Sequence, residues 1–265
     1  MSRFDTELTQ ERVASRIVGF NWDEFLMPEP SIPLAPWLSH LKDHIPIARD
    51  GSDPEGVHQV RVATRRLDAW LVLAQIDVVR DDLRWLRRRA SAVRDIDVLL
   101  LELDPPREFD SWLRELHQDA RRELLVTLDH PRLEGMITAL EAFRPLSMST
   151  ARMVLPKVVR QVLRRGDAVE SSHQDLQKLH RLRRGARRLR YCLEWLGESA
   201  KPLKSAQKVL GEANDVAMTL RYINQSPLRD SLAEYRKTLE HKLVELADRS
   251  ASAWTKSRQS IEGLA

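Results

Sequence analysis

The sequence predicts an all-α protein, and three observations favour this fold class. Leu, Ala, Glu and Arg are abundant, whereas only 9 Gly, 3 Tyr and 5 Phe occur, and this composition is typical of helices. Apolar residues recur at helical spacing in long segments, and no segment alternates apolar and polar residues as a half-buried strand would. A basic motif occurs twice, so we expect two copies of one helical unit and no sheet.

The expected helices form two series, separated by breaks that contain Gly or Pro. Residues 1–30 are expected to form an N-terminal extension, with a short helical stretch after the capping residue Thr6 and a loop from Asn21 to Pro33. The first series is expected near residues 34–48, 54–76, 81–103, 107–128 and 131–142, and the second near 151–165, 172–197, 201–223 and 228–260. The breaks contain Asp50-Gly51-Ser52, Asp104-Pro105-Pro106, Arg144-Pro145, Gly166-Asp167, Gly197-Glu198 and Ser226-Pro227. Because these connections are short, the helices should pack antiparallel in bundles.

The composition excludes several classes of protein. With 42% hydrophobic and 31% charged residues, the 265-residue chain should bury a core and remain soluble. Its longest apolar runs, such as Val98-Leu99-Leu100-Leu101, are far too short to cross a bilayer, and no secretory signal is expected. The single cysteine, Cys192, rules out an internal disulfide and a Cys-based zinc cluster. We therefore expect a protein of a reducing compartment, the cytoplasm.

Positive charge is concentrated after residue 56. The chain has 43 Lys and Arg against 39 Asp and Glu, a formal net charge of +4. Residues 1–56 hold five basic and ten acidic residues, which leaves 38 basic and 29 acidic residues in 57–265. Arg accounts for 34 of the basic residues, and its planar fork of donors suits phosphate oxygens. A GC-rich genome would also produce many Arg residues, so the positions of these residues, and not their number, must show whether they form a phosphate-binding site.

An internal repeat is the main feature of the sequence. The string from Val57 to Leu67 matches the string from Leu179 to Leu189, because both contain His-x-x-Arg-x-x-x-Arg-Arg-Leu at an offset of 122 residues. Downstream, three pairs match at an offset of 120: Arg94-Asp95 with Asn214-Asp215, Arg84 with Lys204, and Arg88 with Lys208. A repeat of this length indicates two copies of one helical unit related by a pseudo-twofold axis.

The motif spacing places the basic residues on one face of each helix. At 100° per residue, His58, Arg61 and Arg65 share a narrow face, opposite an apolar stripe that contains Val60 and Leu67. The second copy repeats this arrangement, and the same geometry adds further basic residues to the faces: His180, Arg183, Arg187, Arg190, Arg84 with Arg88, Lys204 with Lys208, and Lys157 with Arg160 and Arg164.

These faces hold few acids, and Asp68 is the exception in the first copy. Cations on one face repel one another unless acidic partners lie one turn away, so a bound anion would stabilise such a face. A solvated face, or Arg residues paired with acids of neighbouring helices, is the alternative reading. The histidines have alternatives as well, because His58 and His180 could serve in helix packing or capping rather than in binding.

The two strings resemble the two signatures of the CHAD family, the histidine-containing α-helical domain. Arg94-Asp95-Ile96-Asp97-Val98 and Leu210-Gly211-Glu212-Ala213-Asn214-Asp215 are similar to the segments that follow them in the family. The resemblance covers residues 31–265. It implies two four-helix bundles, residues 31–145 and 146–265, around a pseudo-twofold axis with a basic central channel.

The resemblance also implies a function, namely the binding of inorganic polyphosphate, often at polyphosphate granules. Sulfate or phosphate is expected to substitute for the polymer. The family's channel residues correspond here to His58, Arg61, Arg65, Arg66, Arg84, Arg88, His180, Arg183, Arg187, Arg188, Lys204 and Lys208. With Lys157, Arg160, Arg164 and Arg190 from the helix geometry, they make up the expected binding residues.

The sequence departs from the family pattern at two places. Asp68 stands where the family often has a basic residue, and Ala90-Ser91 replaces the Leu-Gly found at Leu210-Gly211. Some members carry a tunnel-type triphosphatase domain, a β-barrel with alternating Glu and Lys on its strands, and nothing in this chain resembles it. The protein is therefore expected to bind the polymer without hydrolysing it, as a non-enzyme.

Two other functions remain open. Any basic groove attracts a nucleic acid, although aromatic residues are scarce and no groove-reading motif occurs. A phosphoryl-transfer or phosphatase enzyme would need carboxylates and a metal among the basic residues. Neither His58 nor His180 has a His or Cys one turn away, so no metal site and no cofactor are expected. The sequence sets neither the oligomeric state nor the preferred polymer length.

Overall fold

The computed structural model describes residues 29–102, 105–172 and 174–265, and the helices dominate this part of the chain. The expected helix after Thr6 and most of the expected extension 1–30 lie outside the described residues. The first half contains β1 (Ser31–Ile32), α3 (Ala35–Asp50), α4 (Pro54–Leu73), α5 (Arg80–Glu102), α6 (Arg107–Leu128) and α7 (Pro131–Glu141). The second contains β2 (Leu146–Ser147), α8 (Met148–Glu170), α9 (Leu176–Trp195), the 3-10 turn η1 (Lys201–Leu203), α10 (Lys204–Gln225) and α11 (Ala233–Glu262). The all-α prediction is confirmed.

The two helices that carry the signature motifs begin in the same way. Asp53 precedes α4, and its side chain accepts a hydrogen bond from the Glu55 backbone N–H. Asp175 precedes α9, and its side chain accepts from the backbone N–H groups of Gln177 and Lys178. A capping aspartate at this position satisfies amides that the helix itself leaves without partners. Both aspartates lie five residues before the motif histidine, so the repeat extends to the helix caps.

Two expectations about local structure are wrong. A break was expected at Gly166-Asp167, but α8 continues through both residues to Glu170. Gly166 is needed there because α8 packs directly against the indole of Trp254 on α11, which leaves no room for a side chain. No sheet was expected, yet Ser31–Ile32 and Leu146–Ser147 form a short antiparallel pair. Two residues are too few to show alternation, so the sequence pattern could not reveal these strands.

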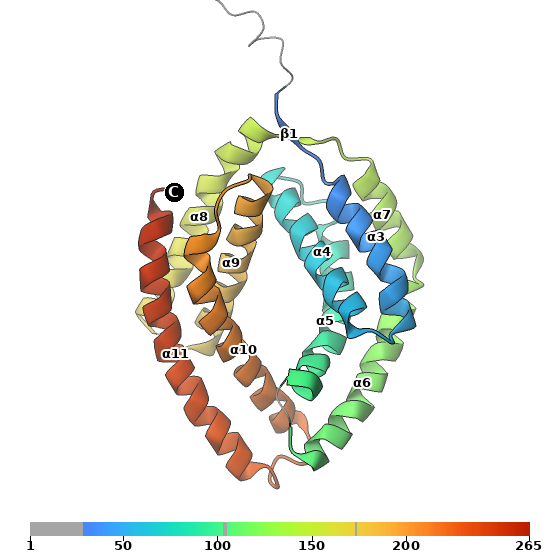
Figure 1. Cartoon of the computed structure of the whole chain (residues 1–265), viewed down its shortest axis with the longest axis vertical. Coiled ribbons are helices and arrows are strands. Elements are labelled where there is room, and N and C mark those ends of the chain that lie inside the picture. Colours follow the sequence, from blue (N-terminus) through green and yellow to red (C-terminus); the bar gives the residue numbers. More distant parts are fainter. Residues whose placement is uncertain (1–28, 103–104, 173) are drawn as a thin grey trace, which may run out of the picture. The chain divides into compact units, whose positions relative to one another are not determined.

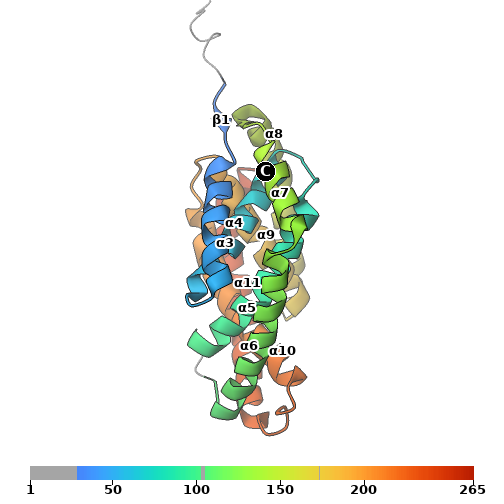
Figure 2. The same ribbon diagram turned by 90° about the vertical axis from the view of Figure 1, so that its right-hand side faces the viewer.

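The four helices that carry the repeated motifs face one another. In Figure 1, α4 and α5 lie on one side and α9 and α10 on the other, while α3, α6 and α7 form the outer layer of the first half. Figure 2 shows this outer layer from the side. α4 and α9 contact each other directly, and the β1–β2 pair also joins the halves. The backbone thus brings the two signature helices together.

Two clusters of buried apolar side chains hold this arrangement, and each draws on both halves. The larger contains Leu41 of α3, Leu67 of α4 and Leu189 of α9, whereas the smaller joins Leu99 of α5 to Ile223 of α10. The predicted division into bundles at residues 145 and 146 stays a prediction, as do the pseudo-twofold axis and the channel. No helix of the described residues is both long enough and apolar enough to cross a membrane.

The contact between Gly166 and Trp254 predicts a position that does not tolerate a side chain. Gly166→Ala should lower the free energy of unfolding by about 1–3 kcal/mol, because the added Cβ would clash with Nε1 of the fully buried Trp254 indole. Urea denaturation measures this change. Gly135→Ala in α7 is the matched control, since a Cβ there meets no atom within 4 Å, and helix propensity should make that variant slightly more stable. Equal stability of the two variants would contradict the assigned packing of α8 on α11.

Candidate functional site

Four Arg side chains of the signature helices lie close together and form what we call the central cluster: Arg61 and Arg65 of α4 with Arg183 and Arg187 of α9. Arg187 of α9 acts electrostatically on both Arg61 and Arg65 of α4, and Arg61 acts on Arg183. The structure therefore brings together the central residues of the two motifs, which are 122 positions apart in the sequence.

The charges of the central cluster are held largely out of water. Burial lowers the pKa of Arg65 well below its usual range, and Arg187, Arg61 and Arg183 lower it further. Burial and Arg187 likewise lower the pKa of Arg183 to about 10, against the opposing effect of Asp215. Guanidinium groups nevertheless stay protonated at neutral pH, so the four charged side chains of the central cluster repel one another in the folded protein.

Two carboxylates offset part of this charge. Arg61 Nη2 lies 3.4 Å from Asp95 Oδ1 of α5, and Arg183 Nη2 lies 4.0 Å from Asp215 Oδ1 of α10. These two pairs occupy matching positions of the repeat. Arg65 and Arg187 themselves form no ion pair with a carboxylate in the part of the chain that the structure describes. The cluster therefore retains an excess of positive charge.

The motif histidines lie at the edge of the central cluster. Burial lowers the pKa of His58, and Arg94 of α5 with Arg61 and Arg65 of its own helix lower it further, although Glu55 opposes them. His58 is therefore mainly neutral at pH 7.

His180 shows the same behaviour with different neighbours. Its Nδ1 lies 3.2 Å from Asn214 Oδ1 of α10. Burial lowers the pKa of His180, and Arg184, Arg183 and Arg187 add to that effect, whereas the contact with Asn214 opposes it. His180 is therefore also mainly neutral at pH 7.

Three other predicted residues form ion pairs at the contact between α4 and α9. Arg66 of α4 lies 2.6 Å from Glu194 of α9, and Arg188 of α9 lies 3.5 Å from Asp68 of α4, so the helices exchange ion pairs in both directions. Glu194 also accepts Arg190 at 3.5 Å. The Arg66 guanidinium further stacks over the Trp37 ring, 4.1 Å from its centroid. These contacts join the halves; whether the three Arg side chains also bind a ligand stays a prediction.

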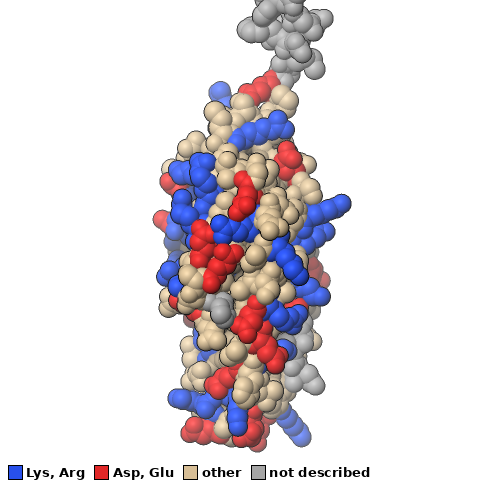
Figure 3. Space-filling model, turned by 90° about the vertical axis from the view of Figure 1, so that its left-hand side faces the viewer, with Lys and Arg blue, Asp and Glu red and all other residues tan. Residues whose placement is uncertain are grey.

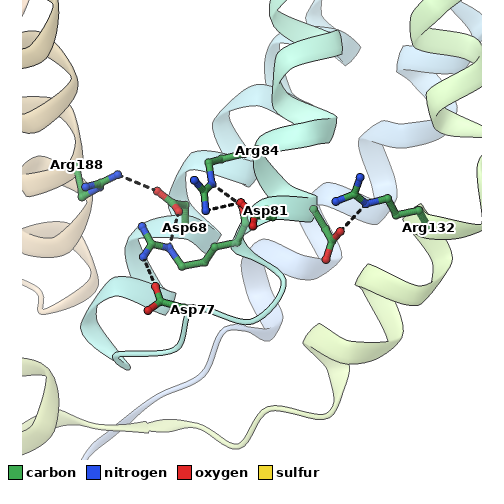
Figure 4. A network of polar contacts seen from close by, with 8 residues as sticks. Asp68, Asp77, Asp81, Arg84, Arg132 and Arg188 are labelled. Atoms are coloured by element: carbon green, nitrogen blue, oxygen red, sulfur yellow. Dashed lines mark hydrogen bonds and ion pairs between the residues drawn. The ribbon is translucent and has the colours of Figure 1, made fainter.

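Asp68 offsets the charges of two arginines near the contact between α4 and α9. Its carboxylate is 5% exposed and lies 3.0 Å from Arg80 Nε as well as 3.5 Å from Arg188 Nη2. Figure 4 shows the contact between Asp68 and Arg188, with Asp77 nearby, and Arg80 pairs with both Asp68 and Asp77. The acid that departs from the family pattern is therefore a bridge between α4, α5 and α9.

The remaining predicted residues are exposed, and the structure does not bring them into the central cluster. Arg84 pairs with Asp81 of its own helix. No ion pair within the described ranges involves the other members of this group, namely Arg88, Lys157, Arg160, Arg164, Lys204 and Lys208. Spacing assigned these residues to a face of their own helix, but it could not fix how that helix is rotated against its neighbours. Their part in binding stays a prediction.

Three residues that the sequence did not single out join the predicted Arg188 in a second group, which we call the flanking cluster: Arg87 of α5, Arg165 of α8, and Arg184 and Arg188 of α9. Burial lowers the pKa of Arg87, and Arg184 and Arg188 add to this effect while Asp68 opposes it. Burial, Arg188 and Arg184 lower the pKa of Arg165. A signal for Arg184 existed, because His180, Arg184 and Arg188 follow one another at intervals of four residues. Nothing local distinguishes Arg87 from Arg88.

The outer surface is different in character. Figure 3 shows Lys and Arg interspersed with Asp and Glu on the side of the molecule where α8 and α11 lie. A cavity of about 370 Å³ between α4, α5 and α6 includes the pair Asp97 and His117, which are 2.8 Å apart, but none of the predicted residues. Among the described residues no three His, Cys, Asp or Glu side chains gather as a metal site would require.

Comparisons with known proteins identify relatives of this fold. Residues 34–224 match the family model described as the CHAD domain. The crystal structure of the CHAD domain from the plant Ricinus communis is similar, with 23% sequence identity and a TM-score of 0.68 over 83% of this chain and 88% of that chain. PptA from Streptomyces chartreusis is 15% identical, with a TM-score of 0.70 over 84% of this chain and 96% of that one. No curated protein matches.

The position of Asp68 predicts a large effect of removing its charge. Asp68→Asn leaves Arg80 and Arg188 without their shared carboxylate, so the free energy of unfolding should fall by about 3 kcal/mol in a denaturant titration. Asp77→Asn is the matched control, because Asp77 contacts the same Arg80 but its side chain is 90% exposed; stability should barely change. If the two variants lost the same stability, the assignment of Asp68 as a buried bridge would be wrong.

Proposed function

The chain belongs to the CHAD family, a family associated with polyphosphate binding, and from this premise we propose that it binds inorganic polyphosphate at the central cluster without hydrolysing it. The observation that carries the proposal is the excess of buried positive charge at Arg61, Arg65, Arg183 and Arg187. Phosphate oxygens would occupy the place that carboxylates leave open beside Arg65 and Arg187.

The chemistry of the cluster suits phosphate. Arg presents paired N–H donors that match two oxygens of one phosphate, and such charge-assisted hydrogen bonds are stronger than neutral ones. An anion at the cluster would also relieve the mutual repulsion that lowers the pKa of Arg65. Binding therefore gains both from new contacts and from the loss of repulsion in the empty protein.

The distribution of the charges favours a polymer over a single phosphate. Arg183 and Arg187 of the central cluster and Arg184 and Arg188 of the flanking cluster alternate along the same stretch of α9. A chain of linked phosphates can occupy several such positions at once, and each further contact is then intramolecular. A single phosphate would satisfy only one of them.

The carboxylates support binding without catalysis. Asp95 pairs with Arg61 and also lies 3.9 Å from Arg221 of α10, and Asp215 pairs with Arg183. A general base or a metal ligand needs a carboxylate that is available to substrate or metal. We further propose that the protein acts in the cytoplasm and uses this binding to associate with polyphosphate granules.

A competition experiment tests this function. Long-chain polyphosphate should displace single-stranded and double-stranded nucleic acid from the protein at physiological salt, and the affinity should fall steeply as salt is added. Arg65→Gln and Arg187→Gln should each weaken polyphosphate binding roughly tenfold or more, because each removes a charged donor. The variants should be at least as stable as the parent, since each also removes a source of repulsion.

The control is the double variant Arg122→Gln and Arg249→Gln, which removes two exposed charges that belong to neither motif. It should bind almost as tightly as the parent. Preferential binding of nucleic acid, or an unchanged affinity after loss of Arg65 and Arg187, would overturn the proposed function. Release of phosphate from the polymer in the presence of Mg²⁺ would overturn its non-enzymatic part.

The motif histidines predict a pH dependence. Because the pKa values of His58 and His180 lie below the ordinary 6.5 in the empty protein, both are neutral at pH 7, and a bound polyanion would raise these pKa values. Binding then takes up protons, so affinity should rise as the pH falls from 8 to 6, by at most about tenfold per histidine and pH unit. The double variant His58→Gln and His180→Gln should lose this rise. The same pH profile in parent and variant would show that the histidines do not engage the ligand.

A further inference from the structure

A small basic pocket lies between α8 and α9, outside the central cluster. Its volume is about 290 Å³, near the lower end of the range for small-molecule sites. Six residues line it: Gln161, Arg164, Arg165 and Ala168 of α8, with Lys178 and Arg181 of α9. Four of these six are cations and none is an acid.

The cations of this pocket are not neutralised by the protein. Within the described ranges, the side chains of Arg164, Arg165, Lys178 and Arg181 form no ion pair with a carboxylate. Arg181 makes only a long hydrogen bond to Gln177 at 3.5 Å. On the face of the molecule where α8 and α11 lie, by contrast, cationic and acidic side chains are interspersed. A cavity that gathers four cations without an acid is suited to a compact anion of high charge.

Gly185 gives the pocket its geometry. A Cβ at this position would lie 2.7 Å from Arg165 Nη1 and 3.2 Å from its Cδ, so the absence of a side chain lets Arg165 pack across α9. The residue at the matching position of the first copy is Ala63. The second half therefore has at this position the one residue type that leaves room for the Arg165 side chain.

The pocket and the central cluster use opposite faces of α9. At 100° per residue from His180, Arg183 and Arg187 lie at about 300° and 340°, whereas Arg181 and Lys178 lie at about 100° and 160°. A ligand in the pocket therefore does not occupy the central cluster. The pocket is therefore distinct from the central cluster, although it shares Arg165 with the flanking cluster.

We propose that the pocket between α8 and α9 is a second anion site, which binds the terminal group of a condensed phosphate chain. A terminal phosphate carries more charge than a bridging one, since its second ionisation lies close to neutral pH. The ligand can be a free short oligophosphate or the end of a long polymer, because both present the same terminal chemistry. This site rests on the proposed function, because it takes the same class of ligand, and it shares Arg165 with the flanking cluster.

Calorimetric titration of the whole chain with linear tripolyphosphate tests the site. The background variant is Arg65→Gln with Arg187→Gln, in which the central cluster is weakened. Tripolyphosphate should still bind, and adding Arg165→Gln and Arg181→Gln should weaken that binding at least tenfold. Adding Arg122→Gln and Arg249→Gln instead, which removes the same number of charges from exposed positions, should change it little.

A variant that keeps every charge guards against a general electrostatic effect. Gly185→Ala should displace the Arg165 guanidinium and weaken tripolyphosphate binding in the same background, although Ala favours the helix and should not unfold it. Cyclic trimetaphosphate has no terminal group and should bind much more weakly than the linear compound. A long polymer at the same concentration of chain ends shows whether the end of a polymer is accepted as well as the free compound.

The outcomes separate this site from the proposed function. Unchanged tripolyphosphate affinity after loss of Arg165 and Arg181, or equal binding of the cyclic compound, would overturn the second site and leave the central cluster untouched. If loss of Arg65 and Arg187 left long-chain binding intact while loss of Arg165 and Arg181 removed it, the proposed function of the central cluster would be wrong and the second site would stand.

Discussion

Repulsion between buried guanidinium groups is the constraint that the packing of the site helices must overcome and from which the proposed binding site follows. Arg61, Arg65, Arg183 and Arg187 lie together where α4 meets α9, and burial leaves their charges poorly solvated. The contact survives because apolar clusters that draw on both halves hold the helices in place. Ion pairs beside the cluster add to this: Arg66 with Glu194, and Arg188 with Asp68. The scaffold thus tolerates unfavourable electrostatics at one place, as functional sites often do.

Three acidic residues offset part of the positive charge where α4 and α9 meet. Asp95 and Asp215 sit at matching positions and each compensates one arginine of the central cluster, which prevents a group of four uncompensated charges. Asp68 does the same for Arg80 and Arg188 from within α4. Each of these acids is already engaged by arginine, so none of them neutralises Arg65 or Arg187. An anion that enters the site would neutralise the positive charge of the central cluster that these carboxylates leave.

Much of the fold could be predicted from the sequence because helical periodicity is a local property. The breaks at Gly51 and Pro145 were recognisable from residue type alone, whereas Gly166 was misread, since its role is to admit Trp254 from a helix about 90 positions away. The same distinction applies to the site. The repeat identified Arg61, Arg65, Arg183 and Arg187, because two copies of a motif on paired helices must meet. It could not identify Arg87 or Arg165, whose position depends on how α5 and α8 are rotated against α9.

Gly185 in the second half matches Ala63 in the first, and this is one of the differences that make the two halves unequal. Around α3 and α4 the corresponding surface carries aromatic and amide groups, where His40 hydrogen-bonds Gln59 at 2.9 Å and stacks near Trp37. Around α8 and α9 it carries Arg164, Arg165 and Arg181. A condensed phosphate whose terminal group occupied the proposed pocket would meet Gln59, and not a cation, at the position of the first half that matches Arg181, so the two halves would hold such a ligand unequally.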